Sequence, residues 1–410
     1  MKKTFGLLGE KLGHSFSPMI HGYLGDYEYH LFEIPADSLD LFMSEKKFDG
    51  INVTIPYKQS VIPYCATLSA EAQAIGSVNT IVKDRLGALH GHNTDYHGFS
   101  MMLERGKVDP SEKKVLVLGD GGAAKTVRAV IRNMGARELV TISRRGECNY
   151  ENVFRHYDAE IIVNTTPVGM YPDNGNTPVS LSEFRHLECV AELIYNPMRT
   201  KLMLDAQRNG LSCVNGLVML AAQAEMASRL FLDISARPEL VDLICMKILY
   251  NTRNVALIGM PGCGKSTVGK LLAEMMGRRF IDIDSLIERV AGKRIPEIFK
   301  EGGESSFRDL ETRVVSDEAK KSGVVIATGG GVVTRPENLD LLRQNSLIVY
   351  LDRELSELSI GGRPLSEKMG VNALAQQRRH LYESWCDCTI SVDADAKQIA
   401  ERILENLKPD

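Results

Sequence analysis

A glycine-rich loop lies past the middle of the 410-residue chain, in the segment NVALIGMPGCGKSTVGKLLAEMM. It fits the pattern G-x-x-x-x-G-K-S, which begins at Gly259 and ends in Lys265 and Ser266. Glycines let successive backbone N–H groups turn toward phosphate oxygens, and the N-terminus of a following helix adds positive potential. Lys265 can then reach the β- and γ-phosphates, and the Ser266 hydroxyl can ligate Mg²⁺. The predicted nucleotide-binding residues are Gly262, Cys263, Gly264, Lys265, Ser266 and Thr267.

A second glycine turn, of a different kind, lies earlier in the chain, in KKVLVLGDGGAAKTVRAVIRNMG. Its small residues, which approximate a dinucleotide-binding fingerprint, are Gly119, Gly121, Gly122, Ala123 and Ala124. An NAD-binding domain carries an acid about 20 residues further on, for the ribose 2′-hydroxyl. This chain has Ser143, Arg144 and Arg145 there, which suit a 2′-phosphate. We therefore expect NADP(H) rather than NAD, although the sequence alone does not explain Asp120 inside the turn.

Charged residues that could bind a small acid follow the nucleotide-binding loop. The stretch FIDIDSLIE places Asp282 and Asp284 at a strand end, and we expect them to point to opposite faces. The stretch FRDLE places Arg308 and Glu311 one helical turn apart. In ATGGG another strand ends in Gly329–Gly331, where bare backbone can approach a ligand.

In this order the motifs resemble shikimate kinase across nearly all of Thr252–Asp410. The resemblance implies that Asp284 binds the shikimate hydroxyls and orients the one that attacks. It implies that Arg308 and Arg378 hold the carboxylate, because a planar guanidinium can bind two oxygens at once, and that Gly330 contacts the ring. Catalysis would then consist mainly of positioning and charge neutralisation.

The resemblance also implies the nucleotide side of this site, with ATP and Mg²⁺ as cofactors. Asp282 would lie in the metal's shell, and Arg363 of GGRPL would close over the phosphates. Two segments depart from the family pattern: DRELSELSIGGRPLSEK is short and lacks an arginine before the glycines, and SVDADAKQ has acids where an arginine is common. Both departures concern the adenine contacts.

Polar motifs flank the second glycine turn. Before it come GHSFSP, GINVTIPYK, IGSVNT and HNTDYHGF, and after it come NTTPVGM, ELIYNP and VNGLVMLAAQA. Hydroxyls, amides, one lysine and one aspartate suit a small polyhydroxylated anion. Hydride transfer to a ketone requires a proton for the new alkoxide and a cation that stabilises it meanwhile. Lys58 and Asp95 are the predicted proton-transfer pair.

Together these motifs resemble shikimate dehydrogenase over roughly Met1–Tyr250. The resemblance implies substrate contacts from Ser15, Ser17, Thr54, Lys58, Asn79, Asp95, Tyr195 and Gln223. It places Thr165, Ile194 and Gly216 on the nicotinamide side. Tyr96 stands where the family usually has glycine, and Glu192 where it usually has aspartate.

Apolar β-rich runs alternate with helical patterns, which predicts an α/β protein with parallel sheets covered by helices. We expect a Rossmann-like NADP-binding domain at 96–210, inserted into a substrate-binding domain formed by 1–95 and 211–250. A P-loop kinase domain is expected at 253–410. The segment SARPELVDLICMKILYNTRN reads as a helix followed directly by a strand, so the junction has no flexible linker.

The composition is that of an ordinary globular protein, with 44% hydrophobic and 25% charged residues. A formal net charge of −4 gives no general attraction to nucleic acids or anionic membranes. The apolar stretch LVMLAAQAEMASRLFL contains Gln223, Glu225 and Arg229, so it is not expected to span a bilayer. Eight cysteines without paired spacing suit a reducing, cytoplasmic location. The sequence leaves the oligomeric state open.

The two resemblances predict consecutive reactions: NADPH-dependent reduction of 3-dehydroshikimate to shikimate, followed by ATP-dependent phosphorylation to shikimate 3-phosphate. Three alternatives remain at this point. The N-terminal part could be an NAD-dependent quinate or shikimate dehydrogenase, or a non-catalytic module that regulates the kinase. The C-terminal part could phosphorylate another polyol acid such as gluconate.

Overall fold

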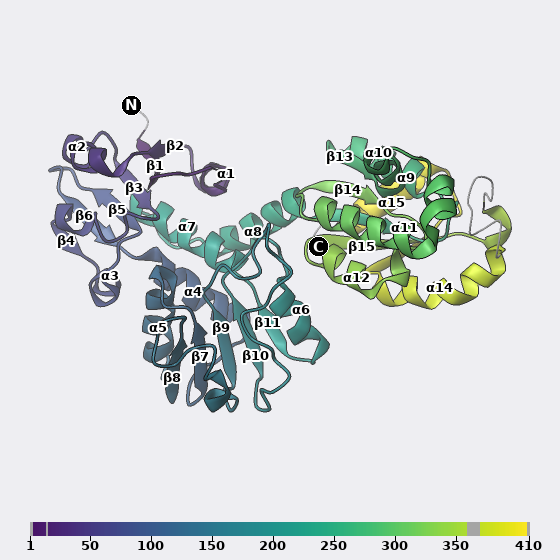
Figure 1. The fold of residues 1–410 in the computed structure, drawn as a ribbon. Coiled ribbons are helices and arrows are strands. Elements are labelled where there is room, and N and C mark those ends of the chain that lie inside the picture. Colours follow the sequence, from purple (N-terminus) through teal and green to yellow (C-terminus); the bar gives the residue numbers. More distant parts are fainter. Residues whose placement is uncertain (1–2, 14, 359–369, 408–410) are drawn as a thin grey trace. The chain divides into compact units, whose positions relative to one another are not determined.

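The computed structural model describes residues 3–13, 15–358 and 370–407. The chain divides into two compact units, whose elements Figure 1 labels. Unit 1 comprises Met1–Gly169, Gly175–Tyr195 and Asp205–Cys245, and unit 2 comprises Met170–Asn174, Asn196–Leu204 and Met246–Asp410. Among the described residues, no helix combines the length and the apolar character that crossing a membrane requires.

Unit 1 begins with a six-stranded mixed sheet in the order β2-β1-β3-β5-β6-β4. Its strands are β1 (Thr4–Gly9), β2 (Glu28–Glu33), β3 (Gly50–Val53), β4 (Thr67–Leu68), β5 (Thr80–Lys83) and β6 (Leu89–His92). The pairs β3–β5 and β5–β6 are antiparallel, and the others are parallel. The associated helices are α1 (Ser17–Leu24), α2 (Leu39–Glu45) and α3 (Ala70–Ile75).

The second sheet of unit 1 is entirely parallel, in the order β11-β10-β9-β7-β8. Its strands are β7 (Lys114–Leu118), β8 (Glu138–Ile142), β9 (Ile161–Asn164), β10 (Cys189–Glu192) and β11 (Ser212–Val214). The apolar runs predicted to be buried strands are strands, and β7, β9 and β10 are buried throughout. This confirms the Rossmann-like architecture of the middle segment.

Two long helices of unit 1 pack on each other: α4 (Thr94–Arg105) and α7 (Leu217–Leu232). Helix α7 coincides with the apolar stretch that we did not expect to span a membrane. Helix α5 (Gly122–Asn133) follows the second glycine turn, and α6 (Lys201–Arg208) precedes β11. Because α4 starts after β6 and packs against both α7 and α5, it joins the substrate-side sheet to the parallel sheet.

Unit 2 contains a parallel sheet in the order β13-β14-β12-β15-β16. Its strands are β12 (Asn254–Ile258), β13 (Arg279–Asp282), β14 (Val324–Ala327), β15 (Ser346–Asp352) and β16 (Cys388–Ser391). The helices are α9 (Lys265–Met276), α10 (Ile283–Ala291), α11 (Ile295–Ala319), α12 (Pro336–Arg343), α14 (Val371–Trp385) and α15 (Ala396–Leu407). The parallel sheet with its helices confirms the predicted P-loop architecture.

The junction is a helix followed directly by a strand, as predicted: α8 (Pro238–Thr252) is separated from β12 by a single residue. The short 3-10 helices are Ala36–Ser38, Ile62–Tyr64, Val153–His156, Val332–Thr334 and Leu355–Glu357. In open parallel sheets, ligands bind beyond the carboxyl ends of the strands, and both glycine loops occupy that position.

Candidate active sites

A cavity of about 360 Å³ in unit 1 brings together motifs from both ends of its sequence. All eight predicted substrate contacts line it, namely Ser15, Ser17, Thr54, Lys58, Asn79, Asp95, Tyr195 and Gln223. Ser17 opens α1, Thr54 follows β3, Asp95 lies in the first turn of α4 and Gln223 lies on α7. Its lining therefore offers hydroxyls, amides, one cation and one carboxylate to a single small ligand.

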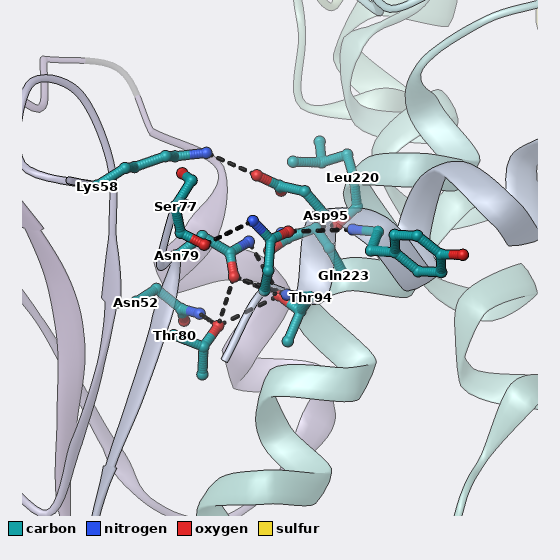
Figure 2. Close-up of polar contacts among 11 residues, drawn as sticks. Asn52, Lys58, Ser77, Asn79, Thr80, Thr94, Asp95, Leu220 and Gln223 are labelled. Carbon is teal, nitrogen blue, oxygen red and sulfur yellow. Dashed lines mark hydrogen bonds and ion pairs between the residues drawn. The ribbon is translucent and has the colours of Figure 1, made fainter. Parts of the chain in front are cut away.

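Lys58 and Asp95 form the charged pair of this cavity. The Lys58 ammonium donates a hydrogen bond of 2.6 Å to Asp95 Oδ2, although 37 residues separate the two in sequence (Figure 2). The side chains are 29% and 18% exposed. Partial burial strengthens the pair while leaving both groups within reach of a ligand and of solvent protons, which is what a proton-transfer pair requires.

A buried hydrogen-bond network fixes the backbone around this pair (Figure 2). Thr94 N donates to Asn79 Oδ1 at 2.7 Å, and Asn79 Nδ2 donates to Thr94 Oγ1 at 3.0 Å. Asn52 Nδ2 donates to Thr80 Oγ1 at 3.0 Å. The sequence analysis missed Asn52, Thr80 and Thr94, because their burial and their hydrogen bonds follow from the pairing of strands and become visible only in the structure. The network holds the start of α4, and with it Asp95.

Tyr195 reaches the same cavity from the segment after β10. Its ring packs edge-on against Phe16, with centroids 5.9 Å apart. Burial raises the pKa of the Tyr195 phenol, so it stays protonated over the ordinary pH range and can donate a hydrogen bond to an anion. Gln223 Nε2 donates to Leu220 O at 3.0 Å.

The second glycine turn has the geometry of a phosphate-binding turn. Gly119 has φ +101°, and a Cβ there would lie 2.7 Å from Thr165 Oγ1, so a larger residue would clash with the β9 end. A Cβ on Gly121 or Gly122 would meet nothing within 4 Å. The N-terminus of α5 therefore faces open space, where backbone N–H groups and the helix dipole favour an anion.

Arg144 and Arg145 face a cavity of about 590 Å³ together with Asp120. Asp120 therefore lines the same cavity as the two arginines expected to bind a 2′-phosphate. Ser143, which we grouped with the arginines, is buried and is not among the residues lining this cavity. Its backbone N–H bonds to Cys148 O at 3.1 Å.

Glu192 is fully buried at the end of β10. Its carboxylate accepts hydrogen bonds from Asn164 Nδ2 at 3.0 and 3.1 Å and from Ile194 N at 3.1 Å. Gly216 N bonds to Ile194 O at 3.3 Å, and a Cβ on Gly216 would lie 2.0 Å from Leu193 O. Ile194 and Gly216 are thus adjacent, and Glu192 ties Ile194 to the end of β9.

A larger cavity of about 640 Å³ lies at the carboxyl edge of the sheet in unit 2. The predicted residues that line it are Gly262, Gly264, Lys265, Ser266, Thr267, Asp282, Asp284, Arg308, Gly330 and Arg378. Gly262 and Gly264 have φ +87° and +104°, conformations that favour glycine. Cys263 is buried and contributes no lining. Lys265 Nζ donates to Gly259 O and Met260 O, both at 2.9 Å.

The predicted metal ligands are adjacent oxygens. Ser266 Oγ donates to Asp282 Oδ2 at 2.5 Å, and a hydroxyl and a carboxylate beside a phosphate cradle fit the oxygen preference of Mg²⁺. The expectation that the two aspartates point to opposite faces was wrong, because side chains two residues apart on a strand share a face. Strand β13 ends at Asp282, which caps α10 by accepting from Ser285 N at 3.0 Å, so Asp284 lies in the first helical turn. Both aspartates consequently line one cavity.

Arg308 and Glu311 form a buried pair on α11. Arg308 Nη1 donates to Glu311 Oε2 at 2.7 Å, and Arg308 Nη2 donates to Glu304 Oε1 at 3.2 Å. Glu311 is fully buried, and burial raises the pKa of its carboxyl. Burial lowers the pKa of Arg378, whose Nη1 donates to Gly330 O at 3.2 Å. Two largely desolvated guanidinium groups therefore line this cavity, and they suit a carboxylate.

The three glycines after β14 leave room for other residues of the site, not only for a ligand. A Cβ on Gly329 would lie 2.5 Å from Glu311 Oε1, one on Gly330 2.6 Å from Pro261 Cδ, and one on Gly331 2.0 Å from Arg308 Nη2. The run Gly329–Gly331 thus lets the acid-binding side chains and the nucleotide loop approach each other.

Arg363 lies outside the described residues. The cavity of unit 2 also has lining residues that the sequence analysis missed, among them Glu288, Arg294, Phe299 and Arg353. Of these four residues, only Arg353 could have been found from the sequence, because it is charged and directly follows the strand β15.

Two family models match the chain. Residues 7–81 match the shikimate dehydrogenase substrate binding domain, and residues 261–408 match shikimate kinase. Over 251 residues the chain is 38% identical to the shikimate dehydrogenase (NADP(+)) of Clostridium perfringens, a match that covers 56% of this chain and 92% of that protein.

Solved structures resemble the N-terminal part. One is a chorismate mutase/shikimate 5-dehydrogenase fusion protein from Clostridium acetobutylicum, 36% identical with a TM-score of 0.57, covering 60% of this chain and 97% of that one. Another is shikimate 5-dehydrogenase from Thermus thermophilus in complex with NADP(H) and shikimate, 29% identical with a TM-score of 0.54, covering 59% and 98%.

Proposed function

We propose that this chain, which belongs to the shikimate dehydrogenase family and carries a shikimate kinase domain at its C-terminal end, catalyses two consecutive steps on one substrate. Unit 1 reduces 3-dehydroshikimate to shikimate with NADPH. Unit 2 transfers the γ-phosphoryl group of ATP to shikimate and forms shikimate 3-phosphate. The product of the first reaction is the substrate of the second.

In the first reaction, Lys58 donates the proton that the ketone oxygen requires when its carbon is reduced. Its 2.6 Å contact with Asp95 holds the ammonium in place while the alkoxide develops. The bound nicotinamide supplies the hydride. The other substrate contacts come from Ser15, Ser17, Thr54, Asn79, Tyr195 and Gln223.

Arg144 and Arg145 favour NADPH over NADH, because the cavity that they line would present two guanidinium groups to a 2′-phosphate. Gly119, Gly121, Gly122 and Ala123 hold the pyrophosphate at the α5 N-terminus. Thr165, Ile194 and Gly216 lie on the nicotinamide side. A quinate dehydrogenase from Corynebacterium glutamicum in complex with NAD has a similar fold at 25% identity, so a direct comparison of NADPH with NADH tests this assignment.

In the second reaction, Asp284 orients the attacking hydroxyl, and Arg308 and Arg378 hold the shikimate carboxylate. The phosphates are bound by the loop Gly262 to Thr267, which includes Lys265. Ser266 and Asp282 would hold Mg²⁺, which neutralises phosphate charge when bound. The protein's contribution is alignment of acceptor and donor within one cavity.

One observation carries the proposal: each unit contains a cavity whose lining suits the same polyhydroxylated acid, and only one of them also contains a P-loop. The test is a coupled assay on the purified chain with 3-dehydroshikimate, NADPH, ATP and Mg²⁺, and with products identified by mass. Shikimate should appear without ATP and shikimate 3-phosphate with it. Failure to oxidise NADPH would refute the reductase assignment and favour a regulatory role for unit 1. Phosphorylation of gluconate in preference to shikimate would refute the kinase assignment.

A further inference from the structure

Arg353 lines the P-loop cavity although no predicted role falls on it. It directly follows β15, and its side chain is 33% exposed. The same cavity is lined by Gly262, Lys265 and Ser266. A cation in this position is available to any anion that the loop binds.

The sheet order separates the two ends of the cavity. The P-loop follows the central strand β12, and Asp284 and Gly330 follow β13 and β14 on one side of it. Arg353 follows β15, which pairs with β12 on the other side through Ile258 and Tyr350. The first loop glycine, Gly259, rests against this strand, since a Cβ there would lie 2.6 Å from Leu351 O. Arg353 is therefore next to the nucleotide loop and across it from the residues assigned to the acid.

The neighbouring charges leave the Arg353 guanidinium able to bind a ligand. Asp352, the adjacent acid, accepts hydrogen bonds from Tyr350 Oη at 2.9 Å and Arg379 Nη2 at 3.1 Å. Arg353 Nε pairs with Glu357 Oε2 at 3.2 Å, and the Glu357 side chain is 55% exposed. An ion pair this exposed contributes little to stability, so Glu357 can be exchanged for a stronger anion at small cost.

We propose that Arg353 binds a phosphate group of the nucleotide, as a further nucleotide-binding residue of the kinase reaction. The inference rests on the proposed kinase function. A triphosphate stays anionic with its metal bound, and a guanidinium can bind two phosphate oxygens at once. Arg308 and Arg378 are assigned to the shikimate carboxylate, so among the described lining residues Arg353 joins Lys265 as a cation beside the nucleotide loop.

The test is steady-state kinetics of shikimate phosphorylation by the full chain. Arg353→Ala should raise KM for ATP by about tenfold, as expected for a hydrogen bond to a charged group, and leave KM for shikimate unchanged. KM for GTP should rise by the same factor as KM for ATP, because both nucleotides carry the same phosphates. Reduction of 3-dehydroshikimate on the same chain should not change.

Two control variants separate binding from structure. Arg379→Ala removes an exposed arginine on α14 that does not line the cavity, and Glu357→Gln removes the present partner of Arg353. Both should keep KM for ATP at or below the parental value. An unchanged KM for ATP in Arg353→Ala, a selective loss of ATP over GTP, or an equal effect of Glu357→Gln would overturn the phosphate contact. A parent chain that did not phosphorylate shikimate would overturn the proposed function instead.

Discussion

Lys58→Ala should abolish reduction of 3-dehydroshikimate while shikimate phosphorylation continues. A cation about 3 Å from a developing alkoxide contributes about 5 kcal/mol at an effective dielectric constant of about 20. The 29% exposure of Lys58 reduces this by solvent screening. A loss of about 3 to 4 kcal/mol corresponds to a fall in kcat of roughly two to three orders of magnitude, within the range of general acid catalysis.

The assay follows NADPH absorbance with 3-dehydroshikimate on the intact chain, with binding of shikimate and NADP⁺ measured by calorimetry. Phosphorylation of added shikimate is the internal control for the second unit. Lys47→Ala is the matched variant, since Lys47 is exposed and pairs with Glu45 at the surface. If Lys58→Ala binds both ligands and retains kcat within about threefold of the parent, Lys58 does not supply the proton.

Three further predictions concern other parts of the chain. Lys265→Ala should abolish phosphorylation and leave reduction intact, and loss of both activities would contradict independent sites. Replacing Arg144 and Arg145 together by alanine should raise KM for NADPH by about tenfold or more and change KM for NADH little, and equal changes would refute the 2′-phosphate assignment. Burial lowers the pKa of His21 from 6.5 to about 3. Between those pH values His21 binds a proton in the unfolded chain but not in the folded one, so the free energy of unfolding falls as pH falls. At pH 5.5 it should be about 1.4 kcal/mol lower than at a pH well above 6.5. His21→Gln should flatten this dependence in denaturant titrations, and an unchanged pH slope would contradict it.

The local chemistry of both glycine loops was readable from the sequence. An apolar strand, glycines at fixed spacing and a following helix specify backbone conformation within about ten residues, and Gly119, Gly262 and Gly264 have the positive φ that such turns use. The buried strands could be predicted for the same reason, since continuous apolar runs between turn residues suit strands covered on both faces.

Alternation places side chains two residues apart on the same face of a strand, so it did not support opposite faces for Asp282 and Asp284. The strand also ended two residues earlier than the pattern suggested, because Asp282 caps α10. Gly329–Gly331 line the cavity, in line with the pattern, but the pattern did not show that Glu311, Pro261 and Arg308 also lie where Cβ atoms would be. Local patterns do not reveal which side chain from another element will occupy a space.

By itself the sequence determined which residue types could carry chemistry: the P-loop, the lysine and aspartate of the N-terminal part, and the paired arginines after β8. Only the tertiary structure decided which of these meet. Lys58 and Asp95 are brought to 2.6 Å by strand pairing and a buried amide network, and Arg353 lines the cavity of unit 2 because β15 pairs with β12. The physical reason is that backbone conformation is set by near neighbours, whereas convergence depends on packing between segments far apart in the chain.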